Sequence, residues 1–325
     1  MASTMRAIRV HKFGPPDVLT VEQVPVPQCG EKEVLIRVHA AGVNPVETYI
    51  RSGNYATLPQ LPYTPGNDGA GVVEAVGAGV AKVKPGDRVF TTRKIGGSYA
   101  EYCVCPENAC WILPQRLSFA QGAGIGTPYF TAYRALFQRA HARPSQSVLV
   151  HGASGAVGLA AVQLAKAHGM TIYGTAGTEA GMKLVKESGA HFVFNHKSPA
   201  YVDELMKCTG GQGFDIILEM LANINLGKDC QLLKMNGTIV VIGSRGNVEI
   251  SPRALMGKDA QIVAMALFLA TEQDWADMSA ALTAGLENGT LTPIIDKEYP
   301  LEKAPQAHKD IIESAGAKGN LVLTM

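Results

Sequence analysis

Residues 147–166 read SVLVHGASGAVGLAAVQLAK, and this stretch decides the fold. The apolar run Val148–Val150 predicts a buried strand, and glycines follow at positions 152, 155 and 158. Over 157–165 the apolar residues recur at the spacing of one helix face. A strand, a glycine turn and a helix in this order predict a site for a dinucleotide pyrophosphate. The reason is that glycine lets the backbone approach the phosphates, and the start of the helix attracts an anion.

The glycine spacing departs from the usual G-x-G-x-x-G pattern, because Ala153 stands in the place of its first glycine. The spacing here is Gly152-x-x-Gly155-x-x-Gly158. A glycine triplet alone is weak evidence, and the alternative is a tight turn in a chain with 35 glycines. The flanking strand and helix are the context that supports such a motif, so the nucleotide site is favoured.

Length and composition describe a large globular protein. The chain has 325 residues, which allows about two domains, and 46% of them are hydrophobic and 18% charged. No apolar run approaches the roughly 18 residues of a membrane span, and the N-terminus lacks the apolar core of a signal peptide. The net charge of +1 gives no general attraction to nucleic acid or membranes. The six cysteines are too sparse for a disulfide scaffold, so we expect a cytoplasmic protein.

Cys103, Cys105 and Cys110 raise the question of a metal site. Metal-ligand pairs usually have two to four residues between them, whereas Cys103 and Cys105 have only one. Alternate residues of a strand share one face, so these two thiols also fit the buried side of an apolar strand. We favour this second interpretation.

The first part of the chain, from Met5 to about Phe90, predicts short strands between turns rich in Gly and Pro. The predicted strands are 6–10, 19–24, 34–41, 71–76 and, further on, 98–104. Strands at this spacing indicate a β-rich domain of the barrel type.

From about residue 117 the pattern changes to alternating strands and helices. The predicted strands are 148–151, 171–175, 191–194, 214–219, 238–242 and 260–265, and the helices between them are 155–168, 179–188, 200–207 and 225–233. Gly169 and Gly189 follow the first two helices, as C-cap glycines often do. The alternation predicts an α/β fold with a doubly wound parallel sheet. Helices over 272–287 and 304–314 and a strand over 321–324 are predicted to complete the chain.

Four motifs carry a resemblance to a known family. They are GVNPVETYIRSG at 42–53, PYTPGND at 62–68, HGASGAVG at 151–158 and IGSRG at 242–246. With them the chain resembles the zinc-free quinone oxidoreductases of the medium-chain dehydrogenase/reductase superfamily, the zeta-crystallin type, over nearly its whole length. The resemblance implies a GroES-like catalytic domain built from residues 1–125 and 267–325. It also implies a Rossmann domain that binds NADP, over residues 126–266.

The activity that the resemblance implies is that of an NADPH:quinone reductase, which reduces ortho-quinones by one-electron transfer. A homotetramer is implied as well, with AU-rich RNA as a further partner. Among enzymes, the alternative is an NADPH-dependent reductase of α,β-unsaturated carbonyls. Outside enzymes, the alternative is an AU-rich RNA-binding or lens structural role, for which the balanced charge gives little support.

Zinc is the first question that this family raises. Its zinc-dependent members carry a Cys where this chain has Asn44, and a Gly-His-Glu motif where it has Gly66-Asn67-Asp68. Their third ligand, another Cys, falls near Gly126-Thr127-Pro128. A catalytic zinc needs about three ligands of the Cys, His or acidic type, and Asp68 alone cannot supply them. The short stretch 91–97 has no room for a lobe with four zinc-binding cysteines, so we predict no zinc.

The end of the second strand of the nucleotide domain indicates which nicotinamide cofactor binds. Enzymes for NAD place Asp or Glu there to bind the ribose 2′-hydroxyl, whereas this chain has Ala176. Glu179 lies three residues further on, where an acidic side chain favours a helix start. Lys183 and His196 could meet a 2′-phosphate, although a surface lysine and a capping histidine fit the sequence equally well. The resemblance favours His196, and we predict NADPH.

The remaining cofactor contacts are implied by the resemblance. They are Tyr49, Ser154, Gly155, Ala156, Val157, Gly177, His196, Asn225, Ile242, Gly243, Ser244 and Arg245, with Phe268 near the nicotinamide. Arg245 follows a predicted strand at the carboxyl edge of the sheet. There it can bind a phosphate or ribose, or form a surface salt bridge.

Substrate-side candidates are Asn44, Tyr49, Tyr55, Tyr63 and Thr127, of which Asn44, Tyr49 and Tyr55 form the predicted catalytic set that positions the substrate. A Tyr hydroxyl can orient a quinone oxygen or donate a proton. The more common role of Tyr is packing, with its hydroxyl bonded to the backbone. Because the spacing places no Ser/His/Asp arrangement and no paired carboxylates, we expect catalysis mainly by positioning the nicotinamide against the acceptor.

Overall fold

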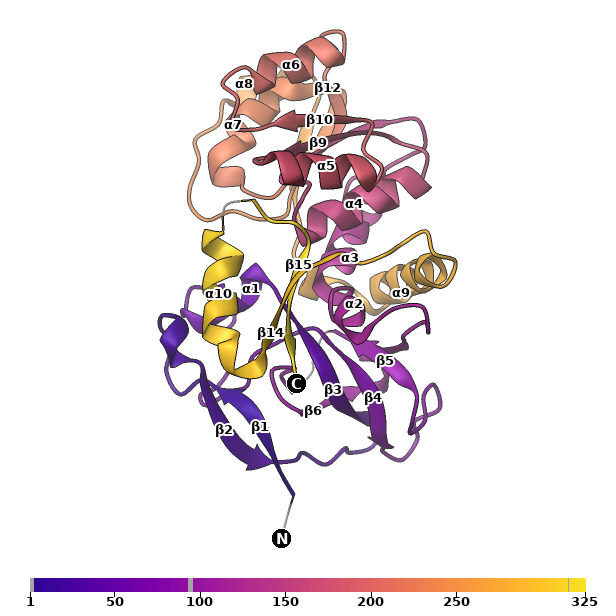
Figure 1. Cartoon of the computed structure of the whole chain (residues 1–325). Helices are drawn as coiled ribbons and strands as arrows, with labels where there is room; N and C mark the ends of the chain where they lie inside the picture. The colour runs from indigo at the N-terminus through magenta and orange to yellow at the C-terminus, as the bar shows by residue number, and fades with distance from the viewer. Residues whose placement is uncertain (1–2, 93–95, 315) are drawn as a thin grey trace. The chain divides into compact units, whose positions relative to one another are not determined.

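The computed structural model describes residues 3–92, 96–314 and 316–325. The chain folds into two compact units. The first unit comprises Met1–Thr127, Thr292–Ser314 and Gly319–Met325, and the second comprises Pro128–Leu291 and Ala315–Lys318. In Figure 1 the first unit therefore includes both the indigo start and most of the yellow end of the chain.

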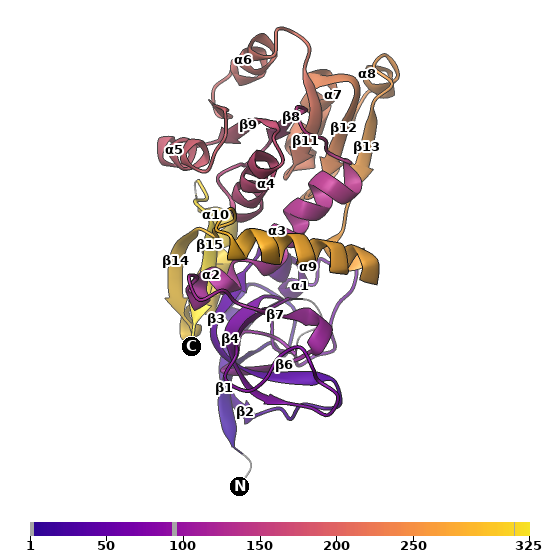
Figure 2. The ribbon, with the colours of Figure 1, turned by 90° about the vertical axis from the view of Figure 1, so that its right-hand side faces the viewer.

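The second unit contains a six-stranded sheet whose neighbouring strands are all parallel. Its order is β10 (Phe192–Asn195), β9 (Thr171–Ala176), β8 (Ser147–Val150), β11 (Phe214–Glu219), β12 (Leu233–Val241) and β13 (Gln261–Ala264). Figure 2 shows the strands from β9 to β13 across this unit. The order reverses between β8 and β11, and open sheets of this type bind ligands at the carboxyl ends of strands beside such a point. The predicted doubly wound α/β sheet is confirmed.

The described helical segments of the second unit are α4 (Ala156–Ala167), α5 (Glu179–Glu187), α6 (Tyr201–Cys208), α7 (Ala222–Leu232), α8 (Pro252–Met256), α9 (Glu272–Glu287), the π-helix η3 (Arg134–Arg139) and the 3-10 turn η4 (Leu267–Leu269). The helices α4 to α7 are the four that were predicted between strands. A further helix, α3 (Gly126–Tyr133), crosses the division of the chain. Gly169 and Gly189 have φ angles of 74° and 119°, which confirms that they end α4 and α5 as predicted.

Two positions without a side chain allow close packing in this unit: Gly158 of α4 lies against the glycine loop after β8, and Gly174 of β9 lies against α5 and the same loop. A Cβ on Gly158 would lie 2.6 Å from Ala153 Cα, and a Cβ on Gly174 would lie 2.7 Å from a methyl carbon of Val185. Residues 158–165 of α4 are all buried. The glycine pattern that predicted this region therefore has a direct packing reason.

The first unit is β-rich. Its main sheet has the order β14 (Ile295–Pro300), β15 (Asn320–Thr324), β3 (Glu33–Val43), β4 (Gly69–Val76), β5 (Arg88–Thr91) and β7 (Cys110–Ile112), and β6 (Tyr102–Pro106) also pairs with β3. A separate antiparallel pair consists of β1 (Thr4–Arg9) and β2 (Thr20–Pro25). The helical segments are α1 (Pro45–Arg51), α2 (Phe119–Ala123), α10 (Ala304–Glu313) and the 3-10 turns η1 (Pro16–Val18), η2 (Glu107–Ala109) and η5 (Leu301–Lys303).

The three cysteines of this unit that had raised the question of a metal are core residues. Cys103 and Cys105 both lie on the buried face of β6, as alternate strand residues do. Together with Cys110 they belong to an apolar cluster that includes Val34 and Val89. This placement agrees with the interpretation of thiols on an apolar strand.

The observed division of the chain differs from the expected boundaries, mainly over residues 267–291. These residues belong to the second unit, because α9 packs there. The rings of Trp275 and Phe130 lie 5.1 Å apart, and Arg134 Nη1 is 2.9 Å from Asp274 Oδ2. The first unit therefore resumes at Thr292, after α9 rather than before it.

The predicted strand over 98–104 also differs from the structure, since β6 begins only at Tyr102. The residues before it make separate bonds instead: Ile8 N donates to Tyr99 O, and Ala100 forms a bridge with Ala7. The stretch 91–97, which entered the zinc prediction, includes residues 93–95, which lie outside the described part of the chain. None of the helices in the described part is long and apolar enough to cross a membrane.

Candidate functional site

The glycine loop after β8 is tied to the neighbouring strand β9. Gly152 has a φ of 57°, a conformation that residues with a side chain rarely adopt. Its N–H donates to Thr175 Oγ1 at 3.2 Å, and Ala153 N donates to Thr175 O at 2.8 Å. The loop is therefore held at the carboxyl edge of the parallel sheet.

The start of α4 offers N–H groups to an anion. Gly155 is the N-cap, with extended backbone angles, and its O accepts the first helical bond from Leu159 N. The N–H groups of 156–158 precede that bond and have no helical acceptor. A Cβ on Gly155 would make only ordinary contacts, 3.5 Å from Gly152 O and 3.8 Å from Ala317 Cβ. The position of Gly155 thus leaves room for a ligand close to the backbone.

Two further loops at this edge form one hydrogen-bonded piece, the turn after β11 and the loop after β12. Ile242 N and Gly243 N both donate to Glu219 O, at 2.9 and 3.3 Å. Arg245 N donates to Asn223 Oδ1 at 2.9 Å. The predicted cofactor residues of the 242–245 loop are thereby fixed to the end of β11 and to the start of α7, the helix that carries Asn225.

The end of β9 lies against an imidazole and a lysine side chain that follow β10. Ala176 is fully buried, and its O accepts a bond from His196 N at 3.2 Å. A Cβ on Gly177 would lie 2.7 Å from His196 Nε2 and 3.0 Å from Lys197 Cε. Sequence reasoning had considered His196 but had missed Lys197, whose only signal was its place next to His196 after the third strand. Burial lowers the pKa of His196, with smaller effects from nearby His151 and Lys197.

Lys183, the other phosphate candidate, lies on the exposed side of α5. Its Nζ is 3.8 Å from Glu187 Oε1, one helical turn away. Glu179 occupies the first turn of the same helix, behind the N-cap Thr178, as predicted. The structure thus gives Lys183 a surface ion pair and gives Glu179 the expected place at a helix start.

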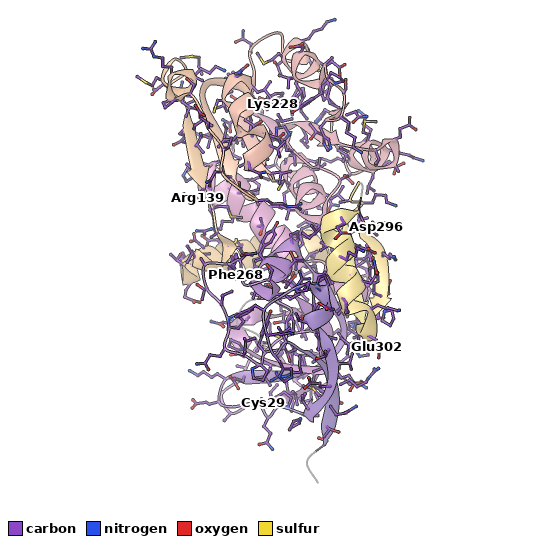
Figure 3. All side chains as sticks on the ribbon, turned by 90° about the vertical axis from the view of Figure 1, so that its left-hand side faces the viewer. Cys29, Arg139, Lys228, Phe268, Asp296 and Glu302 are labelled. Carbon is purple, nitrogen blue, oxygen red and sulfur yellow. The ribbon has the colours of Figure 1, made fainter. Side chains whose placement is uncertain are left out.

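The remaining predicted cofactor residues are distributed over both units. Ser154 is buried, and its Oγ would lie 3.1 Å from a Cβ on Gly181 in α5. Phe268 lies in η4 and is 38% exposed (Figure 3). Tyr49 belongs to α1 of the first unit. Their contacts with a cofactor stay predictions.

Sequence reasoning missed one buried group of ionisable side chains in the second unit, namely His151, Glu219 and Asp229. One nitrogen or oxygen atom of each lies within 4.8 Å of the others. The three residues come from the end of β8, the end of β11 and the middle of α7, so their spacing in the sequence gave no signal. We refer to them below as the buried triad.

In the first unit, Asp68 is the centre of a buried hydrogen-bond network. Its Oδ2 accepts bonds from Asn44 Nδ2 and from Thr127 N, both at 2.8 Å. Its Oδ1 accepts from Thr92 Oγ1 at 2.6 Å and from Thr127 Oγ1 at 3.0 Å. Burial raises the pKa of Asp68, although these donors favour its charged form.

Glu47 extends this network to the start of α1. Its carboxylate accepts bonds from Asn44 N and from both nitrogens of Asn67. Burial, and then the nearby charge of Asp68, raises the pKa of Glu47 to about 8. Asn44, a predicted substrate-positioning residue, is only 5% exposed and its amide is engaged with Asp68, so the structure gives it a supporting place within the network.

The Asp68 network does not fit a catalytic zinc ion. The family resemblance implies zinc ligands at position 44, within 66–68 and near 126–128, but here Asn44 and Thr127 direct N–H and O–H groups at the Asp68 carboxylate. The lone pairs of the Asp68 carboxylate are thus directed at N–H and O–H donors rather than at a cation. A zinc site needs about three Cys, His or acidic ligands, and this position offers one carboxylate.

A cavity of about 310 Å³ lies beside this network in the first unit. Its lining includes Glu47, Ile50, Tyr63 and Asn67. The buried hydroxyl of Tyr63 has no hydrogen-bond partner within the described part of the chain, and burial raises its pKa to about 12. Tyr63 thus lines the cavity as a protonated tyrosine whose hydroxyl is buried, whereas Tyr55 is not among the lining residues and is exposed.

Comparison with known proteins assigns both units. The model of the alcohol dehydrogenase GroES-like domain matches residues 30–115, and the model named zinc-binding dehydrogenase matches residues 156–284. The human quinone oxidoreductase is 53% identical over 324 residues, which cover 99% of this chain and 98% of the relative. The chain therefore belongs to the quinone oxidoreductase family of the medium-chain dehydrogenase/reductase superfamily, and it is an oxidoreductase.

Solved structures agree with this assignment. The Escherichia coli quinone oxidoreductase complexed with NADPH has a TM-score of 0.88 and 30% identity, covering 98% of this chain and all of that one. A mycobacterial protein complexed with NADPH has a TM-score of 0.90 and 29% identity, covering 99% of this chain and all of that one. The expected combination of a GroES-like and a Rossmann domain is confirmed.

The substitution Gly155→Val tests the proposed anion site at the start of α4. We expect it to weaken binding of a nicotinamide dinucleotide by at least about 100-fold, because the side chain would occupy the approach to the N–H groups. The fold should persist, since the added Cβ meets only ordinary contacts. Calorimetric titration measures the affinity, and thermal unfolding measures the stability.

Gly257→Val is a matched control, since Gly257 has similar space but lies at the end of α8, outside the site. Its affinity should equal that of the wild type. Unchanged affinity in Gly155→Val would place the pyrophosphate elsewhere.

Proposed function

We propose that this chain is an NADPH-dependent quinone reductase that works without a catalytic zinc ion. The observation that carries the choice of cofactor is the pair of side chains against Gly177 at the end of β9, namely the cationic Lys197 and the imidazole of His196, which can donate a hydrogen bond. The choice of substrate is supported by the human relative named quinone oxidoreductase. Structures of related proteins in complex with NADPH support the cofactor.

The preference for NADPH over NADH has an electrostatic basis. The 2′-phosphate is an anion, and charge-assisted hydrogen bonds to cationic side chains favour it. Ala176 stands where an acidic residue would bind the hydroxyl of NAD and repel a phosphate. His196 and Lys197 are both exposed, so their contribution should weaken as salt concentration rises.

The rest of the cofactor fits the second unit in the same way. The N–H groups of 156–158 would hold the pyrophosphate, and the 242–245 loop, with Arg245 at its exposed end, would border it. The bound nicotinamide supplies the reducing equivalents. The residues of the chain bind and orient it, and the backbone bonds between the 242–245 loop and Glu219 keep that loop in place.

Independence from zinc follows from the donor groups of the Asp68 network. Alcohol oxidation depends on a Lewis acid that stabilises the alkoxide, and this network cannot hold one. A quinone is readily reduced, so it needs less electrostatic help. In the first unit, Tyr63 remains protonated at neutral pH and can donate a hydrogen bond to a quinone oxygen in the cavity.

The finer features of the activity come from the family resemblance. We propose ortho-quinones as substrates and one-electron transfer as the mode of reduction. Two quinones would then each accept one electron for every NADPH oxidised to NADP⁺ and a proton. A measured ratio of two quinones to one NADPH during a short reaction would support this stoichiometry.

The partners and location of the protein also stay proposals. A homotetramer in the cytoplasm follows the resemblance, and light scattering would measure the assembly. AU-rich RNA binding or a lens structural role is the alternative outside enzymes, and an RNA affinity that NADPH abolishes would support it. Reduction of α,β-unsaturated carbonyls is the enzymatic alternative.

The substitution Lys197→Ala tests the choice of cofactor. We expect the Kd for NADPH to rise by about tenfold, because one charge-assisted bond to the 2′-phosphate is lost. The Kd for NADH should stay within about twofold, since NADH has no such phosphate. Fluorescence titration with each cofactor gives both values.

Lys183→Ala is a matched control, because it removes a lysine of the same charge that pairs with Glu187 on the surface of α5. Both of its affinities should equal those of the wild type. An equal loss of NADPH and NADH affinity in Lys197→Ala would contradict a role at the 2′-phosphate.

Removal of metal tests the reaction itself. After treatment with a chelator, we expect the protein to oxidise NADPH with 9,10-phenanthrenequinone at an undiminished rate, because the Asp68 network holds no zinc. Absorbance of NADPH follows the reaction, and a simple enone serves as the second acceptor. Turnover of the enone without turnover of the quinone would favour the alternative activity, and loss of the quinone rate on chelation would contradict zinc independence.

A further inference from the structure

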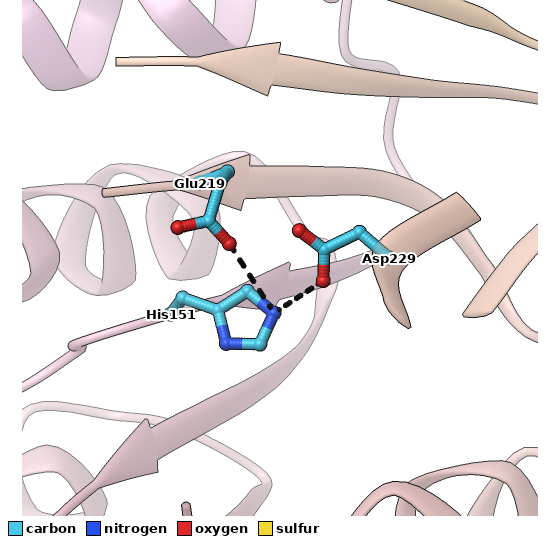
Figure 4. A group of neighbouring side chains, drawn as sticks. All are labelled: His151, Glu219 and Asp229. Carbon is cyan, nitrogen blue, oxygen red and sulfur yellow. Dashed lines mark hydrogen bonds and ion pairs between the residues drawn. The ribbon is translucent and has the colours of Figure 1, made fainter. Parts of the chain in front are cut away.

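The buried triad lies beneath the loops of the cofactor edge. His151 Nε2 is 2.8 Å from Asp229 Oδ1 and 3.7 Å from Glu219 Oε2 (Figure 4). The exposed fractions of these side chains are 3% for His151 and 0% for both acids. Two carboxylates and one imidazole thus share a space that is closed to solvent.

Two carboxylate oxygens of the triad lack a conventional donor. Glu219 Oε2 and Asp229 Oδ2 are buried and have no hydrogen-bond partner among the described residues. An oxygen of Glu219 and an oxygen of Asp229 lie within 4.8 Å of each other, and two ionised carboxylates this close would repel each other strongly in a closed site. A single proton held between Glu219 and Asp229 removes the repulsion and supplies the missing donor.

The charges around the triad agree with this arrangement. Burial raises the pKa of Glu219 to about 7. The charge of His151 lowers this pKa, and the nearby Asp229 raises it. Burial lowers the pKa of His151, but the charge and hydrogen bond of Asp229 outweigh this and raise it overall. Asp229 therefore interacts with one carboxylic acid, Glu219, and with one imidazole, His151, whose pKa is raised.

On one side, the triad supports the turn after β11. Glu219 Oε1 accepts bonds from Leu221 N and from Asn225 Nδ2, the latter at 3.3 Å. The same residue holds the 242–245 loop through its main-chain oxygen. Two predicted cofactor segments thus meet at Glu219.

On the other side, the triad supports the glycine loop. His151 Nδ1 is 3.5 Å from Thr175 Oγ1, which also accepts the bond from Gly152 N. Thr175 immediately precedes Ala176 and Gly177 at the end of β9. The imidazole of His151 therefore lies next to the glycine loop and the end of β9, which are two further predicted cofactor segments.

We propose that the buried triad shares one proton between Glu219 and Asp229 and, in this protonated state, positions the loops that bind NADPH. His151, Glu219 and Asp229 are thus positioning residues, which act on the cofactor through the glycine loop, the turn after β11 and the 242–245 loop. The inference rests on the proposed function, because it concerns NADPH.

The expected pH dependence follows from the loss of this proton. As pH rises through about 7, Glu219 becomes ionised. The new charge repels Asp229, which disturbs the turn after β11 and weakens NADPH binding. The other titratable groups that interact with the triad are Lys228 (Figure 3), His196, Tyr201 and Cys230.

The substitution Glu219→Gln separates the proton from the shape of the side chain. Its amide can still donate to Asp229 and accept from Leu221 N, but it does not titrate. Between pH 6.5 and 8.5, we expect the Kd for NADPH in the wild type to rise about fivefold relative to the Kd in Glu219→Gln. The comparison cancels the titration of the 2′-phosphate and of His196, which both proteins share.

Two further variants complete the binding experiment. Glu219→Ala, which removes the acceptor for Leu221 N, should bind NADPH about tenfold more weakly than Glu219→Gln at every pH. Glu204→Gln on the exposed face of α6 is the matched control and should follow the wild type. Identical pH profiles for the wild type and Glu219→Gln would overturn the proposal.

Infrared spectra across pH test the proton without any cofactor. In the difference between the spectra of the wild type and Glu219→Gln, we expect a protonated carboxyl band that disappears as pH rises through about 7, because the carboxyl band of Glu47, whose pKa is about 8, is common to both proteins and cancels. A wild type that binds no dinucleotide but shows this band would contradict the proposed function and leave proton sharing supported. Absence of the band, or a divalent cation bound in stoichiometric amount that Glu219→Ala loses, would overturn proton sharing.

Discussion

The close packing of α4 and β9 against the glycine loop after β8 is the constraint on which the cofactor edge depends. It requires that positions 158 and 174 carry no side chain, because a Cβ on Gly158 would lie 2.6 Å from Ala153 Cα and a Cβ on Gly174 would lie 3.0 Å from Ala153 Cβ. The helix can then begin directly behind the central strand, and its first N–H groups reach the carboxyl edge of the sheet. The other loops of this edge are fixed to the same place through Thr175 and Glu219.

The two units use buried polar groups in different ways. In the second unit, His151, Glu219 and Asp229 lie under loops and leave two oxygens that a proton can join. In the first unit, both oxygens of Asp68 accept bonds from neutral donors. In our proposals the first arrangement changes with pH near neutrality, whereas the donor groups around Asp68 do not fit a metal ion.

Periodic and local patterns predicted much of the fold. The bounds of α9 and β11 agree with the prediction, and Gly169 and Gly189 end their helices as expected. The place of α9 could not be predicted, because it depends on tertiary packing of Trp275 against Phe130. In the site, the sequence pattern singled out Ala176, whereas His196 was preferred to Lys183 only through the family resemblance. The buried triad could not, because its members come from three separate elements and carry no spacing signal.

The central claim is that the carboxyl edge of the second unit binds NADPH through the start of α4 and the end of β9. A crystal structure of the protein with NADP⁺ would test it most directly. We expect the pyrophosphate within hydrogen-bond distance of the N–H groups of 156–158, and the 2′-phosphate beside His196 and Lys197. A 2′-phosphate held by other residues, with His196 and Lys197 free of it, would contradict the account.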